Sequence, residues 1–234
     1  MIEIKKVTKI YGKNIGNFNI SININNGEIY GILGPNGAGK TTLIRQIMGF
    51  IKSDAGVISF NNLNPWLNSK EIMEDTGYLS GEISLYENLK GIEYLKLIKN
   101  FRPKVNWKYV EKLILHFELN VNTKIKKMSK GMKQKLAIIA AVMHKPKFLI
   151  LDEPTSGLDP VMQDQFNELI LKMREKNKTT IIICSHIFDE IAKLCDRVGF
   201  IKQGKLIEEM KIDNKNMYEI EKHFKKLYER ERVL

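Results

Sequence analysis

One eight-residue stretch constrains this 234-residue chain more than any other feature of its sequence. It fits the pattern G-x-x-x-x-G-K-[ST] and consists of Gly34-Pro35-Asn36-Gly37-Ala38-Gly39-Lys40-Thr41. The mostly apolar residues 28–33 before it predict a short buried strand, and residues 42–48 after it predict the start of a helix. A glycine-rich turn between a strand and a helix lets backbone N–H groups converge on phosphate oxygens. The stretch therefore predicts a phosphate-binding loop, with an ordinary glycine-rich turn as the alternative.

The side chains of this loop also indicate what it binds. Lys40 can reach the β- and γ-phosphates of a nucleotide, and the Thr41 hydroxyl can ligate Mg²⁺. The positive end of the helix that follows favours the same anion. We therefore expect a nucleotide and Mg²⁺ to be bound by the residues of this segment, which are Gly34, Pro35, Asn36, Gly37, Ala38, Gly39, Lys40, Thr41 and Thr42.

The composition is that of a globular protein with a sizeable core, since 43% of the residues are hydrophobic and 28% are charged. The length suits one large domain or a core with an inserted subdomain. No apolar run approaches the roughly 18 residues that cross a bilayer, and the first residues lack the apolar core of a signal peptide. The two cysteines, Cys184 and Cys195, predict small buried side chains rather than a disulfide framework. We therefore expect a cytoplasmic protein.

The net charge of +11 is compatible with several kinds of anionic partner. Nucleic acid, an anionic membrane face and a phosphate ligand are all compatible with it. Because the lysines are spread along the chain, we favour a solvated lysine-rich surface over a dedicated binding patch.

The order of the expected elements predicts an α/β fold. Residues 1–33 are expected to form strands, because Ile20, Ile22 and Ile24 alternate with polar residues, and Asn25-Asn26-Gly27 then predicts a hairpin turn. Further strands are expected at 56–60, 148–151, 179–184 and 197–201, and helices at 161–176 and 187–195. This alternation argues for a mostly parallel sheet with crossover helices.

The last part of the chain predicts a hairpin and a helix. Gln203-Gly204-Lys205 is typical of a hairpin turn, and residues 216–232 predict a charged terminal helix. One side of this helix is expected to be apolar and to carry Met217, Ile220, Phe224 and Leu227.

Two acidic residues follow the buried strand expected at 148–151. Asp152 and Glu153 lie at its carboxyl end, where open α/β sheets place their ligands. Asp152 is suited to hold Mg²⁺, directly or through water, and Glu153 is suited to polarise an attacking water as a general base. A strand that happens to end in acids at the solvent boundary is the alternative. Together with the phosphate loop, the two acids predict hydrolysis of the nucleotide.

Three further motifs surround these acids. Pro154-Thr155-Ser156-Gly157-Leu158-Asp159 follows them, Met128-Ser129-Lys130-Gly131-Met132-Lys133-Gln134 precedes them, and Ser185-His186 closes the next strand. With the phosphate loop, this order resembles the ATP-binding subunit of ABC transporters. The resemblance implies a P-loop NTPase core of mostly parallel sheet, an N-terminal antiparallel β subdomain and an inserted α-helical subdomain. The implied parts are a core at 1–86 and 144–210, a helical subdomain at 87–143 and a helical tail at 211–234.

The resemblance also implies roles for single residues. Tyr11 matches the aromatic residue that stacks on adenine, and a strand aromatic packed in the core is its alternative. Ser129 and Gly131 match the signature motif, which caps the γ-phosphate of ATP on the opposite subunit, although Ser129 alone would be a helix N-cap. Asp159 matches the loop that crosses the dimer interface and would also serve as a helix N-cap. His186 matches the switch histidine that contacts the γ-phosphate, although a histidine at a strand end is usually structural.

The chain departs from the family pattern at two places. The signature commonly has glycine and glutamine where this chain has Lys130 and Met132, and this form looks like that of exporters of drugs, peptide antibiotics and lantibiotics. Gly81 falls where the family usually has a glutamine that contacts Mg²⁺ or the attacking water. Its neighbour Glu82 is the candidate replacement, although a carboxylate would add negative charge near the metal.

The resemblance implies an ATPase that uses ATP and Mg²⁺, with Lys40, Glu153 and His186 as catalytic residues. It implies a homodimer or heterodimer of such subunits that drives separate transmembrane permease subunits at the inner face of the cell membrane. A soluble ABC-type ATPase that acts on nucleic acid or ribosomes is the alternative. We do not favour it, because translation-factor relatives normally carry two nucleotide cores in one chain and this chain has one. A catalytically silent regulatory subunit is a third possibility, because Gly81 replaces the glutamine.

Overall fold

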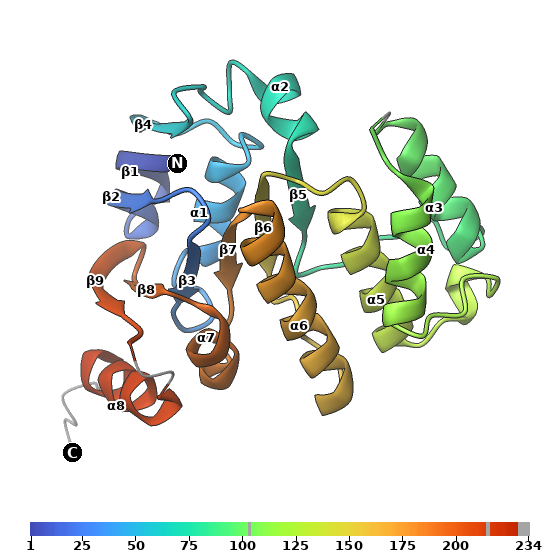
Figure 1. Ribbon diagram of the computed structural model, residues 1–234. Coiled ribbons are helices and arrows are strands. Elements are labelled where there is room, and N and C mark those ends of the chain that lie inside the picture. The colour runs from blue at the N-terminus through green and yellow to red at the C-terminus, as the bar shows by residue number, and fades with distance from the viewer. Residues whose placement is uncertain (103, 214–215, 229–234) are drawn as a thin grey trace. The chain divides into compact units, whose positions relative to one another are not determined.

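The computed structural model describes residues 1–102, 104–213 and 216–228. The chain forms two compact units (Figure 1). The first consists of Met1–Ile72 and Thr180–Leu234, and the second of Met73–Thr179. The helical stretch expected at 87–143 lies wholly within the second unit, and its boundaries as a subdomain stay a prediction.

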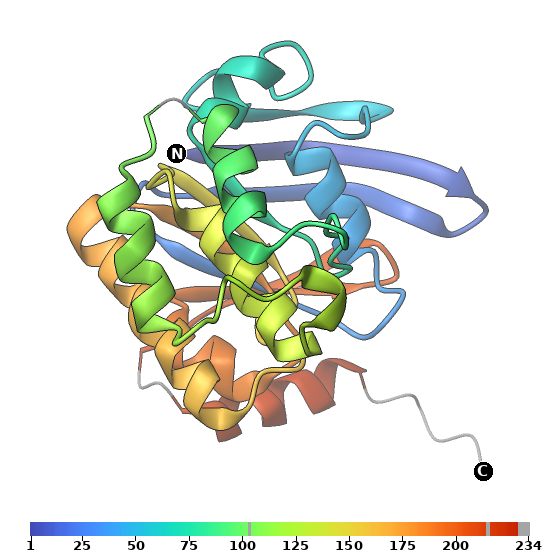
Figure 2. The same cartoon turned by 90° about the vertical axis from the view of Figure 1, so that its right-hand side faces the viewer.

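A three-stranded antiparallel sheet forms the start of the first unit. β1 (Ile2–Gly12) lies between β2 (Ile15–Ile24) and β4 (Ala55–Phe60) and pairs antiparallel with both, as the blue and cyan strands of Figure 2 show. Every second residue from Ile20 to Ile24 is buried, so the expected alternation is confirmed. This sheet is the N-terminal antiparallel β region that the resemblance implied.

The second sheet of this unit carries the phosphate loop. Its strands lie in the order β7 (Thr180–Cys184), β3 (Ile29–Leu33), β8 (Arg197–Lys202) and β9 (Lys205–Lys211). β3 pairs parallel with β7 and β8, whereas β9 pairs antiparallel with β8. All residues of β3 and β7 are buried, as is typical of parallel strands covered on both faces. The helices of this unit are α1 (Lys40–Ile47), α7 (Phe188–Leu194) and α8 (Met217–Tyr228).

The two predicted hairpin turns have different outcomes. Gln203 and Gly204 join β8 to its antiparallel neighbour β9, both with positive φ, so the hairpin predicted there is confirmed. The hairpin predicted at Asn25-Asn26-Gly27 is wrong, because β2 and β3 belong to different sheets. The turn itself is present, and Gly27 adopts φ 75° and donates its N–H to the Thr180 hydroxyl at 2.9 Å. An Asn-Gly sequence fixes a local chain reversal and does not fix which strands pair.

The second unit contains two parallel strands and the helical stretch. β5 (Thr76–Leu79) pairs with β6 (Phe148–Asp152), with Leu79 opposite Leu151. The boundary between the units falls within α2 (Ser69–Glu74). The remaining helices are α3 (Gly91–Asn100), α4 (Trp107–His116), the short 3₁₀ helix η1 (Ile125–Lys127), α5 (Lys130–Val142) and α6 (Pro160–Asn177). Both α3 and α4 lie beside α5 in Figures 1 and 2.

The strands and helices expected along the second half of the chain are confirmed, each within a few residues of its predicted ends. Both cysteines are buried and free, as expected. The terminal helix predicted at 216–232 is present as α8 up to Tyr228, and positions 229–232 lie outside the described residues. Of the apolar side predicted for it, Ile220 is buried while Met217 is exposed.

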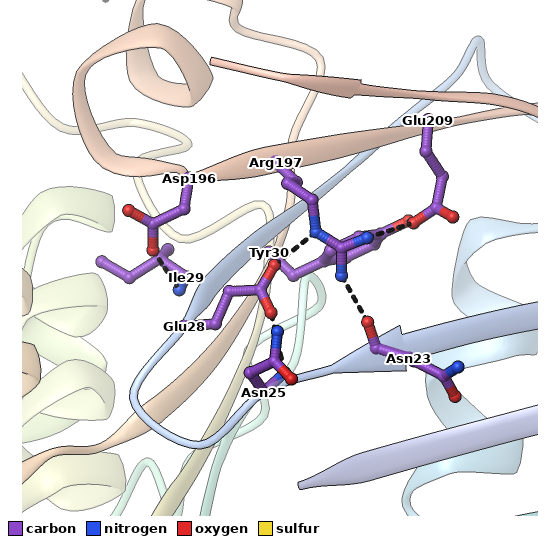
Figure 3. Close-up of polar contacts among 8 residues, drawn as sticks. All are labelled: Asn23, Asn25, Glu28, Ile29, Tyr30, Asp196, Arg197 and Glu209. Carbon is purple, nitrogen blue, oxygen red and sulfur yellow. Dashed lines mark hydrogen bonds and ion pairs between the residues drawn. The ribbon is translucent and has the colours of Figure 1, made fainter. Parts of the chain in front are cut away.

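A polar cluster joins three strands of the first unit (Figure 3). Glu28, only 8% exposed, accepts from Arg197 Nε at 2.6 Å and from the backbone N–H of Asn25 at 2.7 Å. The Arg197 guanidinium also donates to Glu209 at 3.2 Å and to the carbonyl of Asn23. Because Arg197 begins β8 and Glu28 precedes β3, the cluster fixes the end of the sheet opposite to the phosphate loop.

We predict that Arg197→Met lowers the free energy of unfolding by about 3 kcal/mol, since it leaves the buried Glu28 carboxylate without its charged partner. Urea denaturation of the two proteins measures the difference. The matched control is Lys172→Met, which breaks an exposed ion pair with Glu168 and should change stability by less than about 0.5 kcal/mol. Equal stability of Arg197→Met and wild type would contradict the argument.

Candidate functional site

The phosphate loop connects β3 to α1, as its sequence predicts. The Lys40 ammonium donates to the carbonyl oxygens of Gly34 at 2.6 Å and Pro35 at 3.2 Å, so this buried side chain lies across the loop that it belongs to. Gly39 is the N-cap of α1 in the left-handed conformation, and no side chain caps the helix. The loop therefore presents an ammonium group and a helix N-terminus together, which is the arrangement that binds phosphate.

Two of the loop glycines are required by close contacts. A Cβ atom on Gly34 would lie 2.4 Å from the carbonyl oxygen of Ile201. Gly39 has φ 102°, and a Cβ there would lie 2.7 Å from Nδ2 of Asn17. Backbone strain and lack of space thus exclude larger side chains at these positions.

The loop is also held from outside by residues that the sequence analysis missed. The fully buried Asn17 donates from Nδ2 to the Gly39 carbonyl at 3.1 Å, and Gly204 donates its N–H to the Ala38 carbonyl at 2.8 Å. Asn17 is in phase with the polar residues Asn19, Ser21 and Asn23, so the alternation of β2 predicted an exposed side chain. An irregularity in the pairing of β1 with β2, beside Asn19 with its positive φ, shifts this phase, and Asn17 is buried. Gly204 could not be identified from sequence either, because its place in the β8–β9 turn already explained a glycine there.

His186 lies at the same edge of the sheet as the phosphate loop. β7 and β3 are parallel neighbours with Cys184 opposite Ile32, and the Ser185 N–H donates to the Ile32 carbonyl at 3.3 Å. The chain therefore leaves β7 at His186 next to the place where it leaves β3 for the loop. The His186 side chain is exposed at this edge.

Tyr11 lies in β1 and is 55% exposed, so the alternative of a core aromatic does not hold. The Lys9 ammonium lies 5.8 Å from the centre of its ring. An exposed aromatic face is available to stack on a flat ligand, and its role toward adenine stays a prediction.

The second unit carries the two acids and the position of the missing glutamine. Asp152 is buried at the end of β6, and Glu153 follows it with φ 49°. A Cβ atom on Gly81 would lie 3.5 Å from the Asp152 carboxylate, which is ordinary contact distance. The site of the replaced residue is therefore adjacent to the predicted metal ligand, and the exposed Glu82 follows it directly.

The signature segment packs against the segment that follows Glu153. Ser129 is the N-cap of α5, with its hydroxyl accepting from the Met132 N–H at 3.2 Å. The Lys130 side chain lies over Gly157, and its ammonium is 3.5 Å from the Ser156 hydroxyl. These contacts tie the start of α5 to residues 154–159, which end in another helix cap.

Asp159 forms that second cap. Its carboxylate accepts from the Met162 N–H at 2.9 Å, and Pro160 takes the first position of α6. The N-cap geometry expected for Ser129 and Asp159 is thus present, while their roles across a dimer interface stay predictions. Within each unit the structure brings predicted residues together: Lys40 and His186 lie at one sheet edge in the first, and Asp152 lies beside Gly81 in the second.

A family model described as ABC transporter matches residues 18–156, more than half of the chain. The chain belongs to the ABC transporter family. A bacitracin transport ATP-binding protein of Bacillus licheniformis is 39% identical over 216 residues, which cover 92% of this chain and 71% of that protein. A lantibiotic transport ATP-binding protein of Streptococcus pyogenes is 35% identical over 94% of this chain and 95% of its own length.

Solved structures agree with this assignment. The ATP-binding subunit of an ABC transporter matches with a TM-score of 0.84 and 26% identity, over 96% of this chain and 93% of that one. A dimeric ATP-binding cassette in a post-hydrolysis state, bound to ADP and phosphate, matches with a TM-score of 0.81 and 25% identity, over 92% of this chain and all of that one. The predicted P-loop NTPase fold is confirmed, and the chain is an ATP-binding, ATP-hydrolysing subunit of the ABC type. Across the described residues, no helix combines the length and apolarity that a membrane span requires.

We predict that Lys40→Ala weakens MgATP binding by about 100-fold, since each hydrogen bond to a charged group contributes about 1.5–3 kcal/mol. Titration of a fluorescent ATP analogue measures the change. Lys13→Ala, which removes an exposed lysine of the same unit, should bind like wild type. Wild-type affinity of the Lys40 variant would contradict the assignment of the loop.

Glu82 is the candidate replacement for the glutamine that the family usually has at the position of Gly81. If Glu82 serves in its place, Glu82→Ala lowers kcat by at least about tenfold and leaves nucleotide affinity nearly unchanged, since positioned acid–base groups act on the chemical step. The variant Gly81→Gln/Glu82→Ala should recover part of the rate, because a Cβ at Gly81 meets Asp152 at ordinary contact distance and the restored amide would start beside that carboxylate. Steady-state hydrolysis tests both variants, and an unchanged rate in Glu82→Ala removes Glu82 from the site.

Proposed function

We propose that two copies of this chain, or this chain and a similar one, bind two MgATP molecules between them and hydrolyse them to drive separate membrane subunits. The observation that carries the proposal is the Lys40 ammonium held over a glycine-rich loop at the start of α1, on the sheet edge that also carries His186. A triphosphate at this edge meets a positive charge, a helix N-terminus and an imidazole. The chemistry required is phosphoryl transfer to water.

The two acids of the second unit are proposed to complete the reaction. The Thr41 hydroxyl and the Asp152 carboxylate are oxygen donors, which suit Mg²⁺. Bound Mg²⁺ would neutralise charge on the phosphate oxygens. Glu153 would accept a proton from the attacking water, and the His186 side chain would hydrogen-bond the γ-phosphate. Tyr11 would stack on the adenine ring.

A dimer is proposed from the hydrogen-bond donors of the signature segment. Ser129 and the start of α5 offer a hydroxyl and backbone N–H groups, and the resemblance assigns these donors to the ATP of the opposite subunit. The similarity to a dimeric cassette bound to ADP and phosphate supports this arrangement. Gly131 has no side chain to obstruct such a contact, and Asp159 lies on the segment proposed to cross the interface.

The relatives support a proposal for the cargo and the location. Proteins named for bacitracin and lantibiotic transport are 35–39% identical to the chain. We therefore propose an exporter of drug, peptide-antibiotic or lantibiotic type, with the chain bound to permease subunits at the inner face of the cell membrane. The alternative of an ATPase acting on nucleic acid or ribosomes is not favoured, because these relatives carry transport in their names.

We predict that Glu153→Gln retains ATP binding, loses hydrolysis and accumulates as a closed dimer, because ATP that joins the subunits is no longer cleaved. Size-exclusion chromatography with light scattering in saturating MgATP measures the mass. The rate of hydrolysis should fall by about 100-fold or more if Glu153 is the general base.

The matched control is Asp164→Asn, which neutralises an exposed acid on α6 of the same unit and should hydrolyse ATP like wild type. A Glu153→Gln protein that stays monomeric at high concentration contradicts the dimer, and one that hydrolyses at the wild-type rate contradicts the base.

A further inference from the structure

The terminal helix α8 is packed on the first unit through a row of aromatic side chains. The Phe224 ring lies edge-on to Phe188, with centroids 5.1 Å apart, and stacks on Tyr228 at 4.0 Å. Figure 1 shows α8 beside α7, the helix that Phe188 begins. Since Phe188 is two residues after His186, this aromatic row reaches the segment that carries the switch histidine.

The Tyr228 hydroxyl meets the sheet directly under the phosphate loop. It donates to the Ile201 carbonyl at 2.7 Å and lies 3.5 Å from the Leu33 carbonyl. Leu33 is the residue before Gly34, and the Ile201 oxygen is the atom that a Cβ on Gly34 would meet at 2.4 Å. The Tyr228 hydroxyl therefore binds the Ile201 carbonyl, and this carbonyl packs against Gly34, the first residue of the loop.

The end of α8 is fixed from a second direction. Lys202, at the end of β8, donates to the Leu227 carbonyl at 2.7 Å, and its ammonium lies 5.5 Å from the Tyr228 ring. A cation at the carboxyl end of a helix is favourable, because the last carbonyl groups carry partial negative charge. A tyrosine hydroxyl is protonated at neutral pH, and burial raises the pKa of Tyr228 further above its ordinary value.

We propose that Tyr228 is a positioning residue for the nucleotide site, which holds the β8 and β3 carbonyls at which the phosphate loop begins. The inference rests on the proposed function of that loop in binding MgATP. The stack of Tyr228 on Phe224 orients the hydroxyl, and the contact of Phe224 with Phe188 links the same helix to the start of α7. The terminal helix thus braces both segments of the first unit that are expected to face the triphosphate.

The test is Tyr228→Phe, which keeps the aromatic stack and removes only the donor. We expect the Kd for MgATP to rise about threefold to tenfold, the range that one lost hydrogen bond gives. Amide hydrogen exchange at residues 34–40, measured without nucleotide, should become faster by a similar factor. The matched control is Tyr218→Phe on the same helix, where the residue is 67% exposed and both quantities should stay at wild-type values.

The outcomes separate positioning from simple packing. A Tyr228→Phe protein with a lower thermal midpoint but unchanged Kd and unchanged exchange at 34–40 would overturn the inference, because α8 would then only stabilise the fold. If wild type itself fails to bind MgATP, the proposed function fails, and the exchange measurement alone then decides the role of Tyr228. Faster exchange at 34–40 in Tyr228→Phe and not in Tyr218→Phe supports it.

Discussion

The position of β3 between two parallel neighbours is the constraint on which the site of the first unit depends. Its five residues are buried, and its register sets Ile32 opposite Cys184 and Leu33 opposite Phe200. Parallel strands end at the same edge of a sheet, so the loop that leaves β3 and the segment that leaves β7 emerge together. The Lys40 ammonium, the N-terminus of α1 and His186 share this edge for that reason, although they are far apart in sequence.

The sequence was sufficient for features with local signals. The glycine pattern of the loop, the apolar strand before Asp152 and the cap residues Ser129 and Asp159 each act within a few residues of chain, and each appears where it was predicted. The hairpin predicted at Asn25-Asn26-Gly27 was wrong because strand pairing depends on contacts beyond the turn. Its turn is local and present, but β2 pairs with β1, the strand just before it, whereas β3 pairs with β7 and β8, which come much later in the chain.

The supports of the loop could not be predicted from sequence because they are long-range contacts. Asn17 and Gly204 approach the loop from β2 and from the β8–β9 turn, and Tyr228 approaches its base from the other end of the chain. The predicted apolar side of α8 named Phe224 but not Tyr228, since a tyrosine with a polar partner is not recognised by apolar periodicity. That the phosphate loop, Asp152 and Glu153 act on one nucleotide is a proposal that rests on the family resemblance.

The two departures from the family pattern differ in how the second unit accommodates them. At Gly81 the chain removes a side chain beside Asp152, and the exposed Glu82 follows this position directly. At Lys130 the chain adds a side chain, whose methylene groups occupy the space over Gly157, where φ is 81° and a Cβ would lie 2.9 Å away. The added lysine is therefore built into the packing of residues 154–159 and tied to a position that already requires glycine. A change at Lys130 should thus act on this segment, and through it on Asp159, as well as on the charge at the start of α5.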